Sequence, residues 1–168
     1  MRRSRNRRSG NMILEATMWI PFVLLLLVGM LQLGKTTYVY YTVKKTLYSV
    51  GRYVATSQGV NFCDETGDAT IVAAKNFALT GATDGGTDSP LPSLTSDLIQ
   101  VTTECVDAST GEIGQCNTTG CDGPAGGPRP DYVVVSIPDG YQVSPRIPYM
   151  LIDPILLRPQ VRVPFGGT

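Results

Sequence analysis

Residues 12–33 have the sequence MILEATMWIPFVLLLLVGMLQL, and this stretch decides the fold of the chain. Its 22 residues include a single charged side chain, Glu15. As a helix the stretch would extend about 33 Å, enough to cross the roughly 30 Å hydrocarbon core of a bilayer. A secretory signal peptide has a shorter apolar centre, of about 7–15 residues, and a small-x-small cleavage site, which is missing here. We therefore predict a transmembrane helix over residues 11–34 that stays attached to the protein.

The charge of the chain is distributed unevenly around this stretch. The 14 basic and 14 acidic residues cancel, but five arginines lie within the first ten positions. Clustered arginine beside an apolar segment stays on the cytoplasmic side of a membrane. We therefore expect a cytoplasmic N-terminus, a single pass through the inner (cytoplasmic) membrane, and an extracytoplasmic remainder. The acidic remainder argues against a nucleic-acid-binding arm.

Two residues within the apolar stretch need an explanation. Glu15 is an acid near the cytoplasmic end, and a carboxylate at the centre of a bilayer costs about 2.5–3.5 kcal/mol on insertion scales. Such a group either pairs with a partner or lies close enough to the boundary to be hydrated. Pro21 removes one helical hydrogen bond, so we predict a kink in the membrane-spanning helix there.

The spacing around Glu15 resembles a known processing motif. An arginine cluster ending in Ser9-Gly10, then Asn11 to Leu14, then Glu15 and a long apolar run, resembles the prepilin-peptidase substrates of type IV pilins and pseudopilins. The resemblance implies that residues 1–10 are a basic leader, cleaved between Gly10 and Asn11. A new α-amine at Asn11 would be largely protonated at neutral pH, and Glu15 of a neighbouring helix could neutralise it.

Other residues distinguish the chain from major pilins. Asn11 replaces the usual Phe, Ala16 follows Glu15 where the small tight-adherence pilins have Tyr, and the exported part is larger. With the segment Val50-Gly51-Arg52-Tyr53-Val54-Ala55, these features resemble the TadE-like minor pilins of tight-adherence pili, over residues 2–58. The resemblance implies as partners a prepilin peptidase, a major pilin, other minor pilins, the inner-membrane assembly platform and the lipid bilayer.

The helix is expected to continue outside the membrane over residues 35–58. Val39, Val43, Leu47, Val50 and Val54 recur at helical spacing and form one apolar stripe. The stripe is expected to pack on the C-terminal domain of the same chain, with packing between subunits as the alternative.

The remainder, residues 59–168, is expected to form a small α+β domain. Residues 68–79 have a helical pattern that Gly81 ends, and residues 81–93 are expected to be a flexible loop. Residues 97–106, 132–137 and 160–165 are strand candidates for an antiparallel sheet. The apolar segment at residues 148–157 is too short to span a membrane, and its prolines favour an ordered crossover that packs on the sheet. The fold class is thus α+β, with a long N-terminal transmembrane helix before a disulfide-linked domain.

The four cysteines fall on the side assigned to the oxidising exterior. Cys63, Cys105, Cys116 and Cys121 are expected to form disulfides, because the chain has no His and C-x4-C is a poor zinc spacing. Three connectivities are possible. The preferred one pairs Cys63 with Cys105, joining the end of the long helix to a strand, and Cys116 with Cys121.

Catalytic and metal motifs are missing from the sequence. Without His there is no Ser-His-Asp or Cys-His arrangement, and no Walker loop or dinucleotide glycine pattern occurs. We therefore expect no enzyme activity, no cofactor and no metal. The acids in residues 83–88 lack the spacing of a calcium loop, so a solvated turn is favoured. Residues 117–119 match a glycosylation acceptor by pattern only.

Three functions are compatible with these observations. The first is a processed TadE-like minor pilin that takes part in tight-adherence pilus assembly, surface adhesion or secretion. The second is an uncleaved single-pass scaffold of a secretion or assembly machine. The third is a membrane-anchored extracytoplasmic binding module.

Overall fold

The computed structural model describes residues 7–64, 66–86, 89, 91–116, 129–145 and 153–166, with side chains from Met12 onward. Within these residues the fold comprises two α-helices and six short strands. The helices are α1 (Arg7–Thr56) and α2 (Ala69–Thr80), and a 3-10 turn, η1, covers Ser96–Leu98. The strands are β1 (Gln100–Val106), β2 (Ile113–Gln115), β3 (Tyr132–Ser136), β4 (Tyr141–Val143), β5 (Ile155–Leu157) and β6 (Gln160–Pro164).

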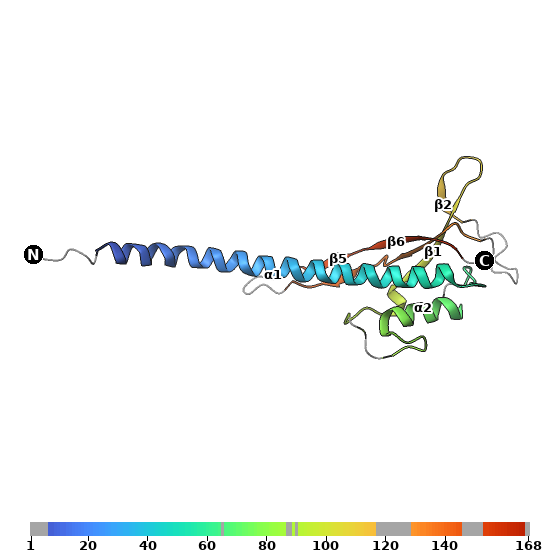
Figure 1. Cartoon of the computed structure of the whole chain (residues 1–168), viewed down its shortest axis with the longest axis horizontal. Coiled ribbons are helices and arrows are strands. Elements are labelled where there is room, and N and C mark those ends of the chain that lie inside the picture. The colour runs from blue at the N-terminus through green and yellow to red at the C-terminus, as the bar shows by residue number, and fades with distance from the viewer. Residues whose placement is uncertain are drawn as a thin grey trace, which may run out of the picture.

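Helix α1 is the dominant element of the molecule. Its 50 residues form one helix, which corresponds to about 75 Å at 1.5 Å per residue. Figure 1 shows its N-terminal part extending well beyond the sheets, while its C-terminal part lies alongside them. One long N-terminal helix is confirmed, and it ends at Thr56. The predicted division of this helix into a part within a membrane and a part beyond it stays a prediction.

The C-terminal part of α1 belongs to the core of the domain. Val43, Leu47, Val50 and Val54 are each 0% exposed, and Val39 packs against the same cluster. Helix α1 contacts β3, β6 and α2 there. The expectation that the apolar stripe packs on the domain of its own chain is therefore confirmed.

Helix α2 begins and ends where the sequence indicates. The carboxylate of Asp68 accepts hydrogen bonds from the backbone N–H of Thr70 (2.9 Å) and Ile71 (3.0 Å), which satisfies two donors of the first turn. Gly81 ends the helix at φ 80°, a conformation that favours glycine. The apolar side of α2 buries Ile71 and Ala74 beneath α1.

The main sheet has four antiparallel strands in the order β2-β1-β3-β6. The pairs Val101 with Val135 and Val135 with Val161 fix the register of its central strands. The strands predicted within residues 97–106, 132–137 and 160–165 are present as β1, β3 and β6, so the antiparallel sheet is confirmed. Asp97 and Leu98, predicted as strand, instead belong to the 3-10 turn η1. The shorter strands β2, β4 and β5, with three residues each, were not predicted, because three residues are too few to establish an alternating pattern.

Strands β4 and β5 form a separate two-stranded sheet. Residues 155–157 were expected to belong to a crossover, and they are instead strand β5, paired with β4 from Tyr141 to Val143. The earlier part of that crossover, residues 148–152, lies outside the described residues. In the segment predicted as a flexible loop, Leu91 is 4% exposed and belongs to the core.

The observed disulfide differs from the preferred pairing. Cys105 is bonded to Cys116, with their Cα atoms 4.8 Å apart, so both predicted pairs, Cys63–Cys105 and Cys116–Cys121, are wrong. The physical reason is a tight turn that the sequence analysis missed. Gly111 N–H donates to the Asp107 carbonyl at 2.8 Å, and the chain returns as β2 to place Cys116 beside Cys105. Cys63 is also disulfide-bonded, and Cys121 lies outside the described residues.

Candidate functional site

The N-terminal part of α1 exposes an unusual amount of apolar surface. From Met12 to Leu27 every side chain is exposed, and the large apolar ones have exposed fractions between 52% for Leu27 and 76% for Met12. Soluble monomers rarely expose contiguous apolar patches of more than a few hundred Å². By length and composition, α1 from Met12 to Thr56 can cross a membrane. This segment is therefore the first candidate for a functional surface.

Glu15 lies within this exposed apolar surface. Its side chain is exposed, and within the part of the chain that the structure describes it makes no hydrogen bond or ion pair. The carboxylate is therefore accessible from outside the molecule, and Met12, Met18 and Trp19, three of its neighbours one helical turn away, are apolar. Gly10 and Asn11, the predicted cleavage site, lie on the helical backbone of α1; the description of side chains begins after them.

Pro21 lies inside α1, and its effect on hydrogen bonding is local. Proline has no N–H, so the Thr17 carbonyl one turn earlier loses its usual helical donor. The Thr17 hydroxyl donates to the Ile13 carbonyl at 2.8 Å, which keeps this polar side chain satisfied on the helix. The predicted kink stays a prediction.

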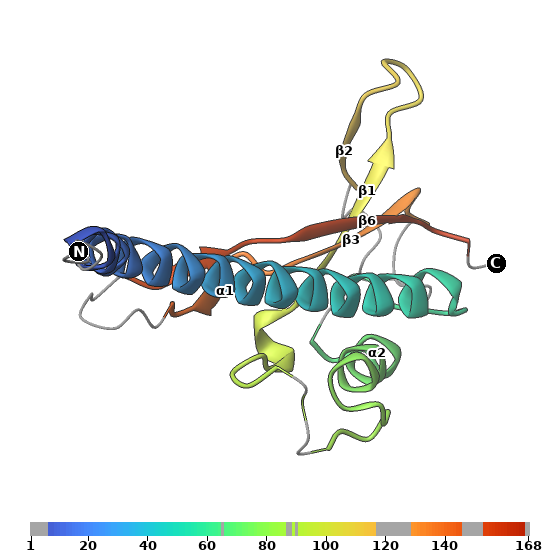
Figure 2. The same ribbon diagram turned by 60° about the vertical axis from the view of Figure 1, so that its left-hand side comes forward.

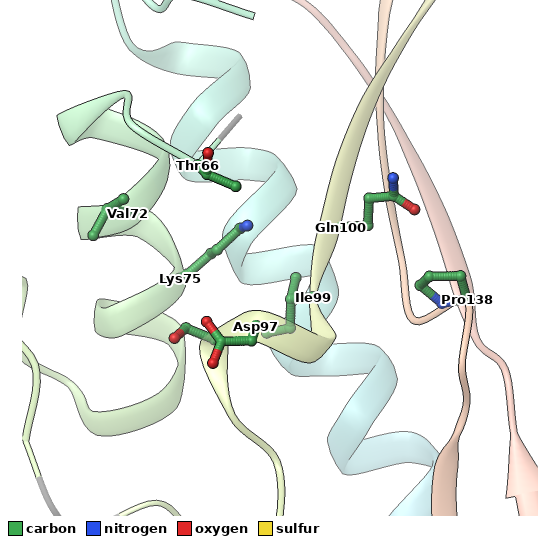
Figure 3. A pocket seen from close by; sticks show the side chains of 8 residues that line it. Thr66, Val72, Lys75, Asp97, Ile99, Gln100 and Pro138 are labelled. Carbon is green, nitrogen blue, oxygen red and sulfur yellow. The ribbon is translucent and has the colours of Figure 1, made fainter. Parts of the chain in front are cut away.

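A cavity of about 520 Å³ lies between α2, η1 and the start of β1. Its lining residues are Thr66, Val72, Lys75, Ser96, Asp97, Ile99, Gln100 and Pro138. Figure 3 shows Lys75 extending from α2 toward the space beside Thr66 and Ile99. Lys75 is 7% exposed. The sequence analysis did not single it out, although its position four residues from both Ile71 and Leu79 places it on the apolar side of the helix.

The β1–β2 hairpin is a second surface feature. Asp107 accepts hydrogen bonds in its turn from the Ser109 hydroxyl and from the backbone N–H of Ser109 (2.7 Å) and Thr110 (3.2 Å). These hydrogen bonds hold the pKa of Asp107 below its ordinary value, and the bond from the Ser109 hydroxyl has the largest effect. At the base of the hairpin, Glu104 forms an ion pair with Arg162 of β6 at 2.6 Å.

The other predicted sites are only partly within the described residues. Asp84 of the acidic loop is exposed, while Asp88 and residues 117–119 lie outside the description. Among the described residues, no group of three or more His, Cys, Asp or Glu side chains is placed to hold a metal ion.

Helix α1 thus has an exposed apolar part that contains one carboxylate, Glu15, at one end. At its other end it packs into a disulfide-linked domain. No family model, curated protein or solved structure matches the chain.

Proposed function

We propose that the chain is a TadE-like minor pilin, anchored by α1 in the inner membrane and assembled with other pilins through that helix. The observation that supports this proposal is the difference in exposure between the two parts of α1. Its N-terminal part exposes apolar side chains that have no cover within the described residues, whereas its C-terminal part contributes Val43, Leu47, Val50 and Val54 to the core of the domain. A rod of this kind holds the domain at a fixed position relative to its anchor.

The orientation proposed for this anchor follows from charge. Five arginines precede the apolar segment, and the positive-inside rule retains them in the cytoplasm. The domain then lies outside, where the Cys105–Cys116 disulfide is stable. The exposed apolar surface and the oxidised hairpin both support this placement.

The proposed mechanism begins with proteolysis. A prepilin peptidase cleaves between Gly10 and Asn11 on the cytoplasmic side and leaves a cationic α-amine on Asn11. Glu15 of one subunit accepts a hydrogen bond from this amine on a neighbouring helix. One neutral pair then replaces two isolated charges at the edge of the bilayer, which favours docking of the helices side by side in one register.

The experiment that tests this function is analysis of the N-terminus of the protein purified from its host. Intact-mass measurement and N-terminal sequencing are expected to find Asn11 as the first residue. Recovery of residues 1–10 on the protein in assembled pili or in the membrane would contradict the proposal and favour the uncleaved scaffold. The matched control is the Gly10→Leu variant, in which the bulky side chain at the cleavage site is expected to leave the leader attached.

A further inference from the structure

The exposed side of α1 carries a second regular stripe beyond the apolar segment. Its members follow one another at spacings of three, four, three and four residues, which places them on one helical face: Tyr38, Tyr41, Lys45, Tyr48 and Arg52. This outer stripe faces away from the buried stripe of Val43, Leu47 and Val50, because the two are half a turn apart on the helix. The three tyrosines are 71%, 65% and 50% exposed in chain order.

Much of the outer stripe lies too far along α1 for its tyrosines to contact the lipid headgroups. Tyr48 follows Leu33 by 15 residues, or about 22 Å of helix, whereas the headgroup region adds only about 5–8 Å on each side of the hydrocarbon core. Tyr48 and Arg52 are therefore beyond the reach of the lipids. Tyrosine and arginine are the residues that protein interfaces favour.

The β1–β2 hairpin has the complementary chemistry. Val106 and Ile113 lie opposite each other in the register, and they are 41% and 46% exposed. Asp107 and Glu112 flank them with two exposed carboxylates, and residues 104–116 contain no Lys or Arg. Figure 2 shows the hairpin projecting away from the rest of the sheet. The hairpin therefore presents an apolar pair bordered by negative charge.

The two surfaces cannot meet within one chain. Helix α1 packs on β3 and β6, toward one edge of the sheet whose strand order is β2-β1-β3-β6. The β1–β2 hairpin lies at the opposite edge. The outer stripe also faces away from the sheet. A contact between them therefore needs a second molecule.

We propose that the β1–β2 hairpin of one copy docks on the outer stripe of a second copy of this chain. Asp107 and Glu112 meet Lys45 and Arg52, while Val106 and Ile113 pack against the tyrosine rings. Figure 1 shows the hairpin near the C-terminal end of α1, the end that holds Arg52. Copies anchored in one bilayer stand parallel, so the two surfaces lie at a similar height; this step rests on the anchoring in the proposed function. Because the surfaces differ, the contact is head-to-tail and can extend into an open chain of subunits.

The test is zero-length cross-linking of the full chain in liposomes. Equal amounts of unlabelled and ¹⁵N-labelled protein are reconstituted together, floated on a density gradient and treated with a carbodiimide that joins a lysine amine to a carboxylate. Mass spectrometry is expected to find Lys45 linked to Glu112 in mixed-isotope peptides, which identify links between molecules. Lys45→Glu and Glu112→Lys are each expected to abolish this link. The double variant, Lys45→Glu with Glu112→Lys, should restore a link between the two positions, with the amine now on the hairpin and the carboxylate on the helix.

Two exposed positions provide matched controls. Lys44→Glu changes the adjacent cation at the edge of the outer stripe, and Asp139→Lys changes an exposed acid in another turn; both variants are expected to retain the Lys45–Glu112 link. Floated liposomes without mixed-isotope peptides would overturn the contact while leaving the anchoring intact. A link that persists in Lys45→Glu through Lys44 would equally overturn the assigned register. Protein that fails to float would overturn both the anchoring and the contact.

Discussion

Gly51 lies where α1 packs against the sheet, and its role depends on its missing side chain. A Cβ added there would lie 3.0 Å from Cγ2 of Val163 and 3.3 Å from Cγ2 of Val135. Both distances are shorter than ordinary van der Waals contact between carbon atoms. Glycine in a helix costs about 1 kcal/mol relative to alanine, and close packing on β3 and β6 offsets that cost.

The Gly51→Ala variant is therefore expected to be less stable despite its better helix propensity. Overpacking a core costs about 1–3 kcal/mol and the propensity gain is about 1 kcal/mol, so the free energy of unfolding should fall by about 1 kcal/mol. Urea unfolding in detergent, followed by near-UV circular dichroism, measures this change. Gly34→Ala is the control, because an added Cβ there meets no described atom within 4 Å. Equal or greater stability of Gly51→Ala would show that the packing is looser than the structure indicates.

Tyr141 makes stability depend on pH in the alkaline range. Burial raises the pKa of its phenol above the ordinary value of 10.0, and its hydroxyl donates to the Pro92 carbonyl at 2.7 Å. The folded state thus holds the proton more tightly than the unfolded state. This contribution to stability is complete below the unfolded pKa, and it is lost as the pH rises through the folded pKa.

Unfolding midpoints measured between about pH 9 and 11 are expected to fall less steeply for Tyr141→Phe than for the unchanged protein. Tyr38→Phe, which alters an exposed tyrosine, should keep the original slope. Identical slopes for Tyr141→Phe and the unchanged protein would rule out a role for this phenol in the alkaline transition.

At the scale of elements, the β1–β2 hairpin shows how local turn chemistry determines a covalent bond. Asp107, Ser109 and Gly111 form the turn, and the returning strand places Cys116 beside Cys105. A turn with Asp and Gly between the apolar residues Val106 and Ile113 is a known hairpin signal. Reading that signal would have favoured the observed pair over the predicted connections.

Replacing both Cys105 and Cys116 by serine is expected to loosen the hairpin and spare the core. A disulfide closing so short a loop contributes about 3 kcal/mol at most in the chain-entropy model, and β1 keeps its pairing with β3. Hydrogen exchange should therefore accelerate in residues 113–115 and stay unchanged in β3 and β6.

Peptide mapping without reduction provides the direct check on the bond itself. A peptide that joins Cys105 to Cys116 is expected in the unreduced protein. A map that joins Cys63 to Cys105 would instead restore the pairing first predicted from the sequence.

At the scale of the whole molecule, α1 is one continuous helix whose two ends have different surroundings. Its apolar end is exposed and its other end is part of the core, so a sideways contact between two α1 helices also fixes the relative positions of their domains. In the proposed assembly, the single acid in the apolar part, Glu15, would set the register of that contact.

The Glu15→Ala variant is expected to insert into the membrane as well as or better than the unchanged protein, because removing a carboxylate lowers the cost of burial by up to about 2.5–3.5 kcal/mol. Its incorporation into filaments should fall sharply, because in the proposed assembly the α-amine of Asn11 on the next subunit would lose its partner. Immunoblots of membrane and sheared-pilus fractions measure both quantities.

Met18→Ala, one turn along the exposed helix, serves as the control and should assemble normally. Wild-type amounts of Glu15→Ala in the sheared-pilus fraction would exclude the proposed role of the carboxylate.

The sequence by itself determined the parts of the protein that follow from local periodicity. These are the long helix with its apolar stripe, helix α2 between Asp68 and Gly81, and the three longer strands, because each needs only a repeating pattern along one segment. The Cys105–Cys116 pair and strand β2 follow from a local turn signal that the sequence analysis missed. Only the tertiary structure decided the pairing of β4 with β5, the cavity beside Lys75 and the packing role of Gly51. Each of these depends on which segments distant in sequence come together, and a pattern within one segment carries no information about its partner.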